Sequence, residues 1–407
     1  MRQTLAFVMG LSLLVSGCGD TEGSSTSSLT PSSVSTTAPA TSTSLPVLPF
    51  GEELQGALDG VLGGDAATGM SLAVRVPGYE PWLGVAGDSK PGVPVTTGMA
   101  FGAGSTGKNF TAALVLQLAE EGKLSLDDQL QEWLPDYPNI DNSATIRQLL
   151  SHTSGVFTLN HYPGFWSAVF ADGSRVWTDE ELLTTFLAEP YSTPGTEWHY
   201  SNTGYTLLGH IIEEATGSMV STELRDRFFE PLGLTTAFYP PEETARGELA
   251  EGWADVGLYA PDVDPGPGLE PFSQFPWTET MPAAGGMFAS AQDLATWAQA
   301  LFHDKTVLTA ESLDQMLDWV DVDIAAEEAQ LVADYGLGAI RFNPEDLGGE
   351  LLIGHSGGAL FYSALSGYLP DYGVSIGAAQ NTEADDAFGS IVAQVIDLIS
   401  THVAPAA

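Results

Sequence analysis

A serine and a lysine three residues apart, Ser105 and Lys108, have the types and spacing in this chain that point most directly to chemistry. They stand where a predicted helix begins. The run from Phe110 to Leu118 is apolar on nearly all sides, which is typical of a buried helix, and Gly122 is its predicted stop. Residues i and i+3 share one helix face, so the Lys108 amine can reach the Ser105 hydroxyl. A neutral amine there would take the hydroxyl proton and make the serine a nucleophile.

The Ser-x-x-Lys spacing is weak evidence by itself. Among Lys90, Lys108, Lys123 and Lys305, only Lys108 has a serine three positions earlier, and a chance match in such a chain is roughly a one-in-three event. The plainer interpretation is a helix cap beside a solvated lysine. A lysine inside a nearly all-apolar helix is costly unless its charge is paired or suppressed, which favours the chemical interpretation.

Two further motifs supply groups that such a nucleophile needs. Tyr200 and Asn202 flank Ser201 in a Tyr-Ser-Asn run. A phenol can shuttle a proton when a cation lowers its pKa, and an amide can hold both a substrate and the lysine. A glycine-rich run at residues 354–358 follows a short apolar stretch, where its glycines would let a substrate backbone approach. His355 in that run can supply positive charge or a proton near neutral pH. Alone, the Tyr-x-Asn spacing carries little information, and the isolated glycine-rich run is better interpreted as a strand turn with a satisfied histidine.

In this order, the Ser-x-x-Lys run at 105–108, the Tyr-x-Asn run at 200–202 and the His-Ser-Gly run at 355–357 resemble the motifs of the serine penicillin-recognising hydrolases. The Tyr-x-Asn form points to the branch with class C β-lactamases, DD-carboxypeptidases and related esterases. The resemblance covers about residues 52–402 and extends to the stretches at 149–155, 194–205, 230–234 and 284–287. Class C β-lactamases usually carry Lys-Thr-Gly where this chain has His-Ser-Gly. Histidine there is more typical of DD-peptidase-like members, which argues against strong β-lactamase activity.

The resemblance implies a role for each matched residue and no metal or organic cofactor. The implied roles are Ser105 as nucleophile, Lys108 as its base, Tyr200 as general acid/base, Asn202 as substrate-orienting amide, His355, Ser356 and Gly357 as the strand that meets the substrate carboxylate, and the N–H groups of Ser105 and Gly358 as the oxyanion hole. The implied reaction is acyl transfer to serine and then hydrolysis of a small peptide, ester or β-lactam, most closely a D-alanyl-D-alanine carboxypeptidase. Open alternatives are an esterase, a weak class C-like β-lactamase, and a sensor that acylates without turnover.

A different enzyme class also matches the glycine-rich run. Residues 354–358 formally fit the Gly-x-Ser-x-Gly elbow of α/β-hydrolases, which needs a helix directly after it and then an acid and a histidine. A strand-like run at 360–368 follows instead, so this alternative is disfavoured. The histidines show no compact metal-binding spacing, which argues against a zinc hydrolase.

Composition excludes other function classes. The 407 residues carry 53 Asp+Glu against 12 Lys+Arg, a net charge of −41. Such a surface repels nucleic acid and anionic lipid headgroups. The single cysteine, Cys18, excludes internal disulfides and any Cys-based metal site.

The position of Cys18 predicts export and anchoring. Residues 1–18 have a positive start and an apolar core of signal-peptide length, and Val15-Ser16-Gly17-Cys18 resembles a bacterial lipobox, in which the cysteine is lipidated. The Ser/Thr/Pro-rich tract at 19–50 cannot bury a core and is predicted to be a flexible tether. We therefore expect a monomeric enzyme anchored by lipid to the outer face of a bacterial membrane.

The elements that must position these residues form an α+β pattern. Strands are predicted at 71–76, 82–86, 351–353, 361–368 and 374–380, and helices at 54–62, 146–150, 179–187, 205–215, 294–302 and 388–399, the last capped by Thr382 with Asp385. Strands at both ends of the chain indicate one antiparallel sheet, flanked by helices, with a mainly helical insertion. The predicted catalytic domain spans 51–407, with its sheet part at about 51–104 and 285–407 and its helical part at about 105–284.

Overall fold

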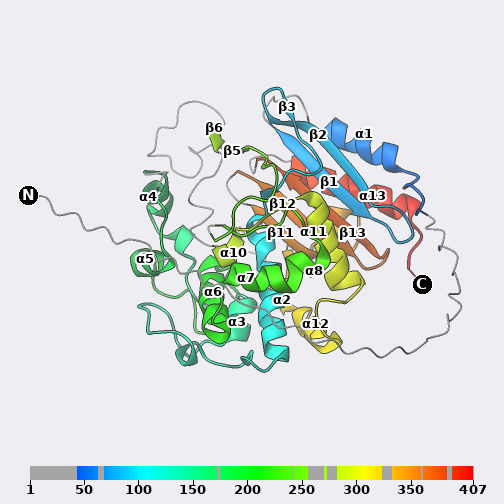
Figure 1. The fold of residues 1–407 in the computed structure, drawn as a ribbon. Coiled ribbons are helices and arrows are strands. Elements are labelled where there is room, and N and C mark those ends of the chain that lie inside the picture. Colours follow the sequence, from blue (N-terminus) through cyan, green and yellow to red (C-terminus); the bar gives the residue numbers. More distant parts are fainter. Residues whose placement is uncertain are drawn as a thin grey trace, which may run out of the picture. The chain divides into compact units, whose positions relative to one another are not determined.

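A nine-stranded antiparallel sheet, in the order β3-β2-β1-β13-β12-β11-β10-β9-β8, is the frame of the fold (Figure 1). The computed structural model describes residues 44–62, 68–171, 175–240, 242–254, 270–272, 282–322, 332–358, 361–382 and 387–406. The strands of the sheet are β1 Gly69–Arg75, β2 Trp82–Lys90, β3 Val93–Pro94, β8 Val320–Asp321, β9 Val332–Tyr335, β10 Ile340–Phe342, β11 Ile353–Gly358, β12 Ser363–Leu369 and β13 Val374–Gln380.

The two ends of the chain meet at the centre of this sheet. Strand β1 pairs with β13 from Met70 opposite Gln380 to Arg75 opposite Ser375, and in Figure 1 the blue and orange strands lie side by side. The predicted fold class, an antiparallel sheet built from both chain ends and flanked by helices, is confirmed. Strand β13 forms at the predicted residues, because its apolar run is buried on both faces.

Helices cover both faces of the sheet. On one face, α1 (Gly51–Val61) and α13 (Ala387–His402) pack together, and Leu54 and Ile391 share a buried cluster with Leu72 of β1. On the other face, α11 (Ala291–Ala298) packs directly on β13. A Cβ at Gly377 would lie 1.9 Å from the Ala291 carbonyl oxygen, so this close approach requires glycine.

A mostly helical part lies beside the sheet, with α2 (Gly107–Glu120) buried along most of its length. Helix α2 contacts α6 (Asn202–Thr216), α10 (Pro282–Gly285) and α12 (Ala310–Met316), and Figure 1 shows α2 in cyan beside α6 in green. The remaining elements are α3 Ile146–Leu150, α4 Phe165–Ala171, α5 Asp179–Thr185, α7 Val220–Leu224, α8 Glu230–Leu232, and the small two-stranded sheets of β4 Phe101–Gly102 with β7 Phe288–Ala289 and of β5 Gly252–Ala254 with β6 Glu270–Phe272.

Several predicted elements differ from the observed ones. The strand expected at 351–353 begins only at Ile353 and continues through the glycine-rich run to Gly358 as β11. It pairs with β12 along all six residues, while Leu351 and Leu352 precede it. The helix expected at 294–302 is α11 followed by a π-helical turn at Gln299–His303. Asp385 of the predicted Thr382–Asp385 cap lies outside the described residues, and so does the predicted lipidation site Cys18.

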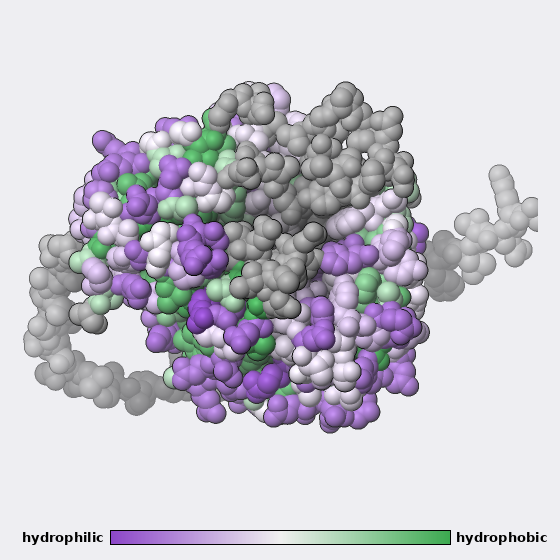
Figure 2. Space-filling model, turned by 180° about the vertical axis from the view of Figure 1, so that it is seen from behind, coloured by the Kyte–Doolittle hydropathy of each residue, from purple (hydrophilic) through white to green (hydrophobic). Residues whose placement is uncertain are grey.

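Among the helices that the structure describes, none combines the length and apolar character needed to cross a membrane. On the face drawn in Figure 2, hydrophilic side chains are interspersed with smaller hydrophobic patches. The predicted domain boundaries, leader and tether stay predictions.

Candidate active site

The turn that carries Ser105 packs closely against Gly357 on one side and Gly285 on the other. It is a 3₁₀ turn, η1 (Gly104–Thr106), that leads directly into α2, and Gly104 has a positive φ of 51°. A Cβ at Gly357 of β11 would lie 2.1 Å from the Ala103 carbonyl oxygen and 2.7 Å from the Ser105 nitrogen. On the other side, a Cβ at Gly285 would lie 3.0 Å from the Gly104 carbonyl carbon. The backbone on both sides therefore fixes the position of the serine.

Lys108 is fully buried one helical turn after Ser105. Its Nζ lies 3.0 Å from Ser105 Oγ, 2.7 Å from Asn202 Oδ1 and 2.5 Å from the carbonyl oxygen of Ala284. Burial lowers the pKa of Lys108 well below its ordinary value, since a charged amine is costly away from water. A neutral amine that donates its two protons to Asn202 and Ala284 directs its lone pair at the Ser105 hydroxyl. This is the arrangement of a general base beside a nucleophile.

Asn202 begins α6 and is held by further polar groups. Its Nδ2 donates to Asn160 Oδ1 at 2.9 Å, and its backbone N–H donates to Thr158 Oγ1 at 3.0 Å. Ser201 caps the helix by accepting from the Gly204 N–H at 3.1 Å. These contacts orient the Asn202 amide so that its oxygen faces Lys108.

Tyr200 lies directly before this helix cap and beside the lysine. The Lys108 Nζ is 4.9 Å from the centre of the Tyr200 ring. The other side of the environment is aromatic, with His152 at 4.2 Å and Trp198 at 6.3 Å between ring centres. The structure thus brings Ser105, Lys108, Tyr200 and Asn202 into one cluster.

Strand β11 forms the other wall of the site. Strand β10 pairs with β11 only at Ile353 and Gly354, and beyond Gly354 no described strand pairs with it on that side. Gly357 packs on the Ser105 turn, and Gly358 is exposed at the end of the strand. Ser356 lies opposite Leu365, which belongs to the cluster beneath α13, so its side chain is on the other face from Gly357.

His355 differs from its predicted role as a source of positive charge. The side chain is 1% exposed, its Nε2 is 2.9 Å from the Tyr335 hydroxyl, and its Nδ1 is 2.6 Å from the Ser356 carbonyl oxygen. Burial, with the neighbouring Lys108, lowers the pKa of His355 to about 3. The imidazole is therefore neutral near pH 7. The expected electrostatic contact between His355 and a substrate carboxylate is corrected accordingly.

The sequence did not reveal several residues that complete the cluster. The Ala284 carbonyl and Asn160 have no motif of their own, because their roles depend on loops folded against α2 and α6. His152 lies within a stretch that resembles the family, but its type alone assigned it no role. Within the described residues, no group of His, Cys, Asp or Glu could hold a metal ion.

A model of the Beta-lactamase family matches residues 54–400. The chain belongs to this family. It is 36% identical over 213 residues to penicillin-binding protein 4 of Amycolatopsis lactamdurans. The aligned region covers 49% of this chain and 51% of the relative. The chain thus spans about half the length of that curated relative.

Two solved structures of similar length share the fold. A D-stereospecific amidohydrolase from Streptomyces sp. is 28% identical, with a TM-score of 0.72, and the match covers 85% of this chain and 98% of that one. The D-amino acid amidase of Ochrobactrum anthropi SV3, complexed with D-phenylalanine, is 26% identical, with a TM-score of 0.75, and the match covers 86% and 99% of the two chains.

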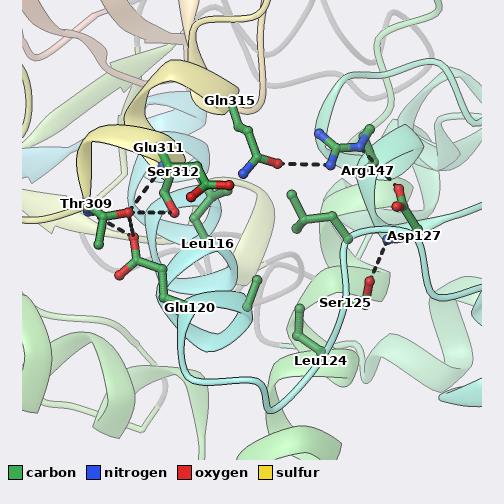
Figure 3. Close-up of a pocket in the computed structure, with 12 residues that line it drawn as sticks. Leu116, Glu120, Leu124, Ser125, Asp127, Arg147, Thr309, Glu311, Ser312 and Gln315 are labelled. Atoms are coloured by element: carbon green, nitrogen blue, oxygen red, sulfur yellow. Dashed lines mark hydrogen bonds and ion pairs between the residues drawn. The ribbon is translucent and has the colours of Figure 1, made fainter.

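A separate pocket of about 520 Å³ lies at the far end of α2 (Figure 3). Two of its charged lining residues are paired: Arg147 donates to Gln315 at 3.0 Å, and Glu120 accepts from Thr309 at 2.9 Å. Leu116 and Leu124 are among its apolar lining residues. None of the clustered catalytic candidates lines this pocket, so it is not the active site that the family resemblance implies.

Proposed function

We propose that the protein is a serine hydrolase that forms an acyl-enzyme on Ser105. The observation that carries this proposal is the buried Lys108 amine, 3.0 Å from Ser105 Oγ and held by two other acceptors. The plainer interpretation of the motif, a serine helix cap beside a solvated lysine, does not fit a lysine that is buried to this extent.

In the proposed reaction, the Ser105 hydroxyl proton passes to the neutral Lys108 amine as Oγ bonds to the substrate carbonyl carbon. The carbonyl electron pair moves to oxygen, where the backbone N–H groups of Ser105 and Gly358 would stabilise the negative charge. The bond to the leaving group then breaks, and this group takes the proton through the Tyr200 hydroxyl. Water repeats the sequence in reverse, which releases the acid and restores Ser105.

The proposed substrate class is a small peptide or amide with a D-configured residue. D-Alanyl-D-alanine carboxypeptidase activity fits the motif order, and the penicillin-binding relative supports it. Hydrolysis of D-amino acid amides is the second candidate. It is favoured by the two amidase structures and by the neutral His355, which supplies no charge for a terminal carboxylate. An ester or β-lactam suits the same machinery.

We further propose an extracytoplasmic location, with the enzyme held at a bacterial membrane through lipidated Cys18. The lipobox-like sequence and the tract that follows it support this location.

Intact-protein mass spectrometry after exposure to acyl donors tests the proposed chemistry. The panel should include a D-Ala-D-Ala peptide, a D-phenylalanine amide, a p-nitrophenyl ester and a fluorescent penicillin. We expect wild type to gain one acyl group and Ser105→Ala to gain none. Ser356→Ala is the matched control and should keep the label, because its side chain lies on the other face of β11. Labelling that depends on Ser356 instead would support the α/β-hydrolase alternative. A burst without steady turnover would identify a sensor.

A further inference from the structure

His152 occupies an unusual backbone conformation next to the proposed catalytic cluster. It follows α3, has a φ of +60° and is fully buried. Positive φ is uncommon for residues other than glycine, and a buried side chain in that conformation persists only where its surroundings hold it. The residue is therefore held in place by specific contacts.

Two of these contacts are hydrogen bonds to the residues directly before and after Tyr200 in the chain. The carbonyl oxygen of His152 accepts the His199 N–H at 2.9 Å, and the His152 Nδ1 accepts the Ser201 N–H at 3.1 Å. One residue thus binds the backbone on both sides of Tyr200. The neighbouring residues continue this connection, since the Thr153 carbonyl oxygen accepts the Gly195 N–H at 2.7 Å.

The imidazole also supports the phenol ring itself. Its centre is 4.2 Å from the Tyr200 ring, 4.6 Å from Tyr335 and 5.2 Å from Tyr205. Tyr335 is fully buried, and its hydroxyl contacts His355. The His152 ring therefore cannot move away from Tyr200 without displacing Tyr335 from the core.

Only the neutral imidazole fits this arrangement. An Nδ1 that accepts from a backbone N–H carries no proton, so the ring proton must be on Nε2, which has no hydrogen-bond partner in the described part of the chain. The titratable groups that face His152 are Lys108 of α2, His355 of β11, Tyr200 before α6, Tyr205 of α6 and Tyr335 of β9. Burial, with Lys108 and His355, lowers the pKa of His152 well below its usual value.

We propose that His152 is the positioning residue of Tyr200: it fixes the backbone on both sides of the tyrosine and supports its ring, so that the phenol stays beside Lys108 and Ser105. This inference rests on the proposed function, in which Tyr200 transfers the proton to the leaving group. A purely structural role would lower the folded fraction but leave the rate of each folded active site unchanged.

The test compares His152→Leu with His152→Asn by the rate constant of acylation per labelled site, using the fluorescent penicillin and normalising to the final label. Asparagine tolerates positive φ, and its Oδ1 can still accept the Ser201 N–H. We expect the leucine variant to acylate about 30- to 100-fold more slowly, within the usual contribution of a general acid/base, and the asparagine variant to stay within about fivefold of wild type. His303→Asn, which lies on another element, is the matched control. If the leucine variant does not fold, His152→Ala replaces it.

The same substitutions in a Tyr200→Phe background decide whether the effect passes through Tyr200. Because coupled residues are non-additive, we expect His152→Leu to cost less than about threefold there. An equal loss in both backgrounds, an equal loss in the leucine and asparagine variants, or an unchanged rate would overturn the proposal. Wild type that takes no label from any donor would overturn the proposed function itself, and the role of His152 with it.

Discussion

Three basic side chains, Lys108, His152 and His355, lie buried near one another, and burial lowers the pKa of each. Their proximity adds mutual repulsion, because Lys108 lowers the pKa of both histidines. Neutrality is useful at this site. In the proposed reaction a neutral Lys108 would accept the Ser105 proton, and His152 accepts the Ser201 N–H through its unprotonated Nδ1.

The pH dependence of His355 follows from this burial. Its pKa is about 3 in the folded protein, below the ordinary value near 6.5, so the unfolded state binds more protons between these limits. Stability contributed by the neutral imidazole is therefore present above about pH 6.5 and is lost as pH falls toward 3. The slope from this group is at most about 1.4 kcal/mol of unfolding free energy per pH unit.

We expect the His355 ring signals in an NMR titration to stay constant from pH 8 to pH 5. His355→Gln should flatten the dependence of unfolding free energy on pH between about pH 6.5 and pH 3. For a carboxylate-bearing substrate, kcat/KM should show no fall through pH 6–7 that depends on His355. An imidazole that titrates near pH 6.5 would contradict the buried, neutral state.

At the scale of elements, the site depends on how closely β11 approaches the start of α2. The contact at Gly357 leaves no room for a Cβ, which would lie 2.1 Å from the Ala103 carbonyl oxygen. That oxygen belongs to backbone, so the whole turn would have to move. The position of Ser105 relative to β11 is thus set by the absence of a side chain.

Gly357→Ala should therefore slow acylation by about 100-fold, since small displacements of reacting groups cost this much, and should lower the melting temperature. Gly389→Ala is the matched control, because a Cβ there meets nothing within 4 Å and Gly389 lies inside α13. The control should stabilise the protein by about 0.4–1 kcal/mol and leave the acylation rate unchanged. Calorimetry and the labelling rate measure the two effects. Normal acylation by Gly357→Ala would show that the turn tolerates displacement.

Sequence patterns identified the elements whose own residues favour them. Helix α3 and strand β13 form at the predicted residues because apolar periodicity and a capping Thr145 specify them locally. The composition of β11 did not itself predict a strand, since a run containing three glycines has low strand propensity. The strand is held by its pairing with β12 along all six residues and with β10 at Ile353 and Gly354. Ser105, Lys108, Tyr200 and Asn202 are brought together as the motifs predicted. The burial that neutralises His355 is a tertiary property that its motif does not encode.

At the scale of the whole molecule, the surplus of acidic residues dominates the surface. Several arginines are already paired with carboxylates, among them Arg225 with Glu243 and Arg227 with Glu121. The hydrogen bond from Arg227 lowers the pKa of Glu121 to about 2. With a net charge of −41, most carboxylates have no basic side chain available to them, so the protein should be repelled by anionic headgroups.

Because of this repulsion, membrane sedimentation of the protein can be used to test whether it is anchored through a lipid on Cys18. The net charge of the chain opposes adsorption to anionic headgroups, so we expect membrane association to depend on the proposed lipid at Cys18. Expressed in a bacterium with residues 1–50 intact, the wild type should sediment with membranes, and Cys18→Ser should accumulate as a soluble or unprocessed form. Ser32→Ala, a change in the same N-terminal tract that spares the cysteine, should sediment as wild type does. Metabolic labelling with a fatty-acid analogue should follow Cys18, because the chain has no other cysteine. Cys18→Ser that still sediments fully with membranes after a high-salt wash would refute the anchor and require an attachment through the domain itself.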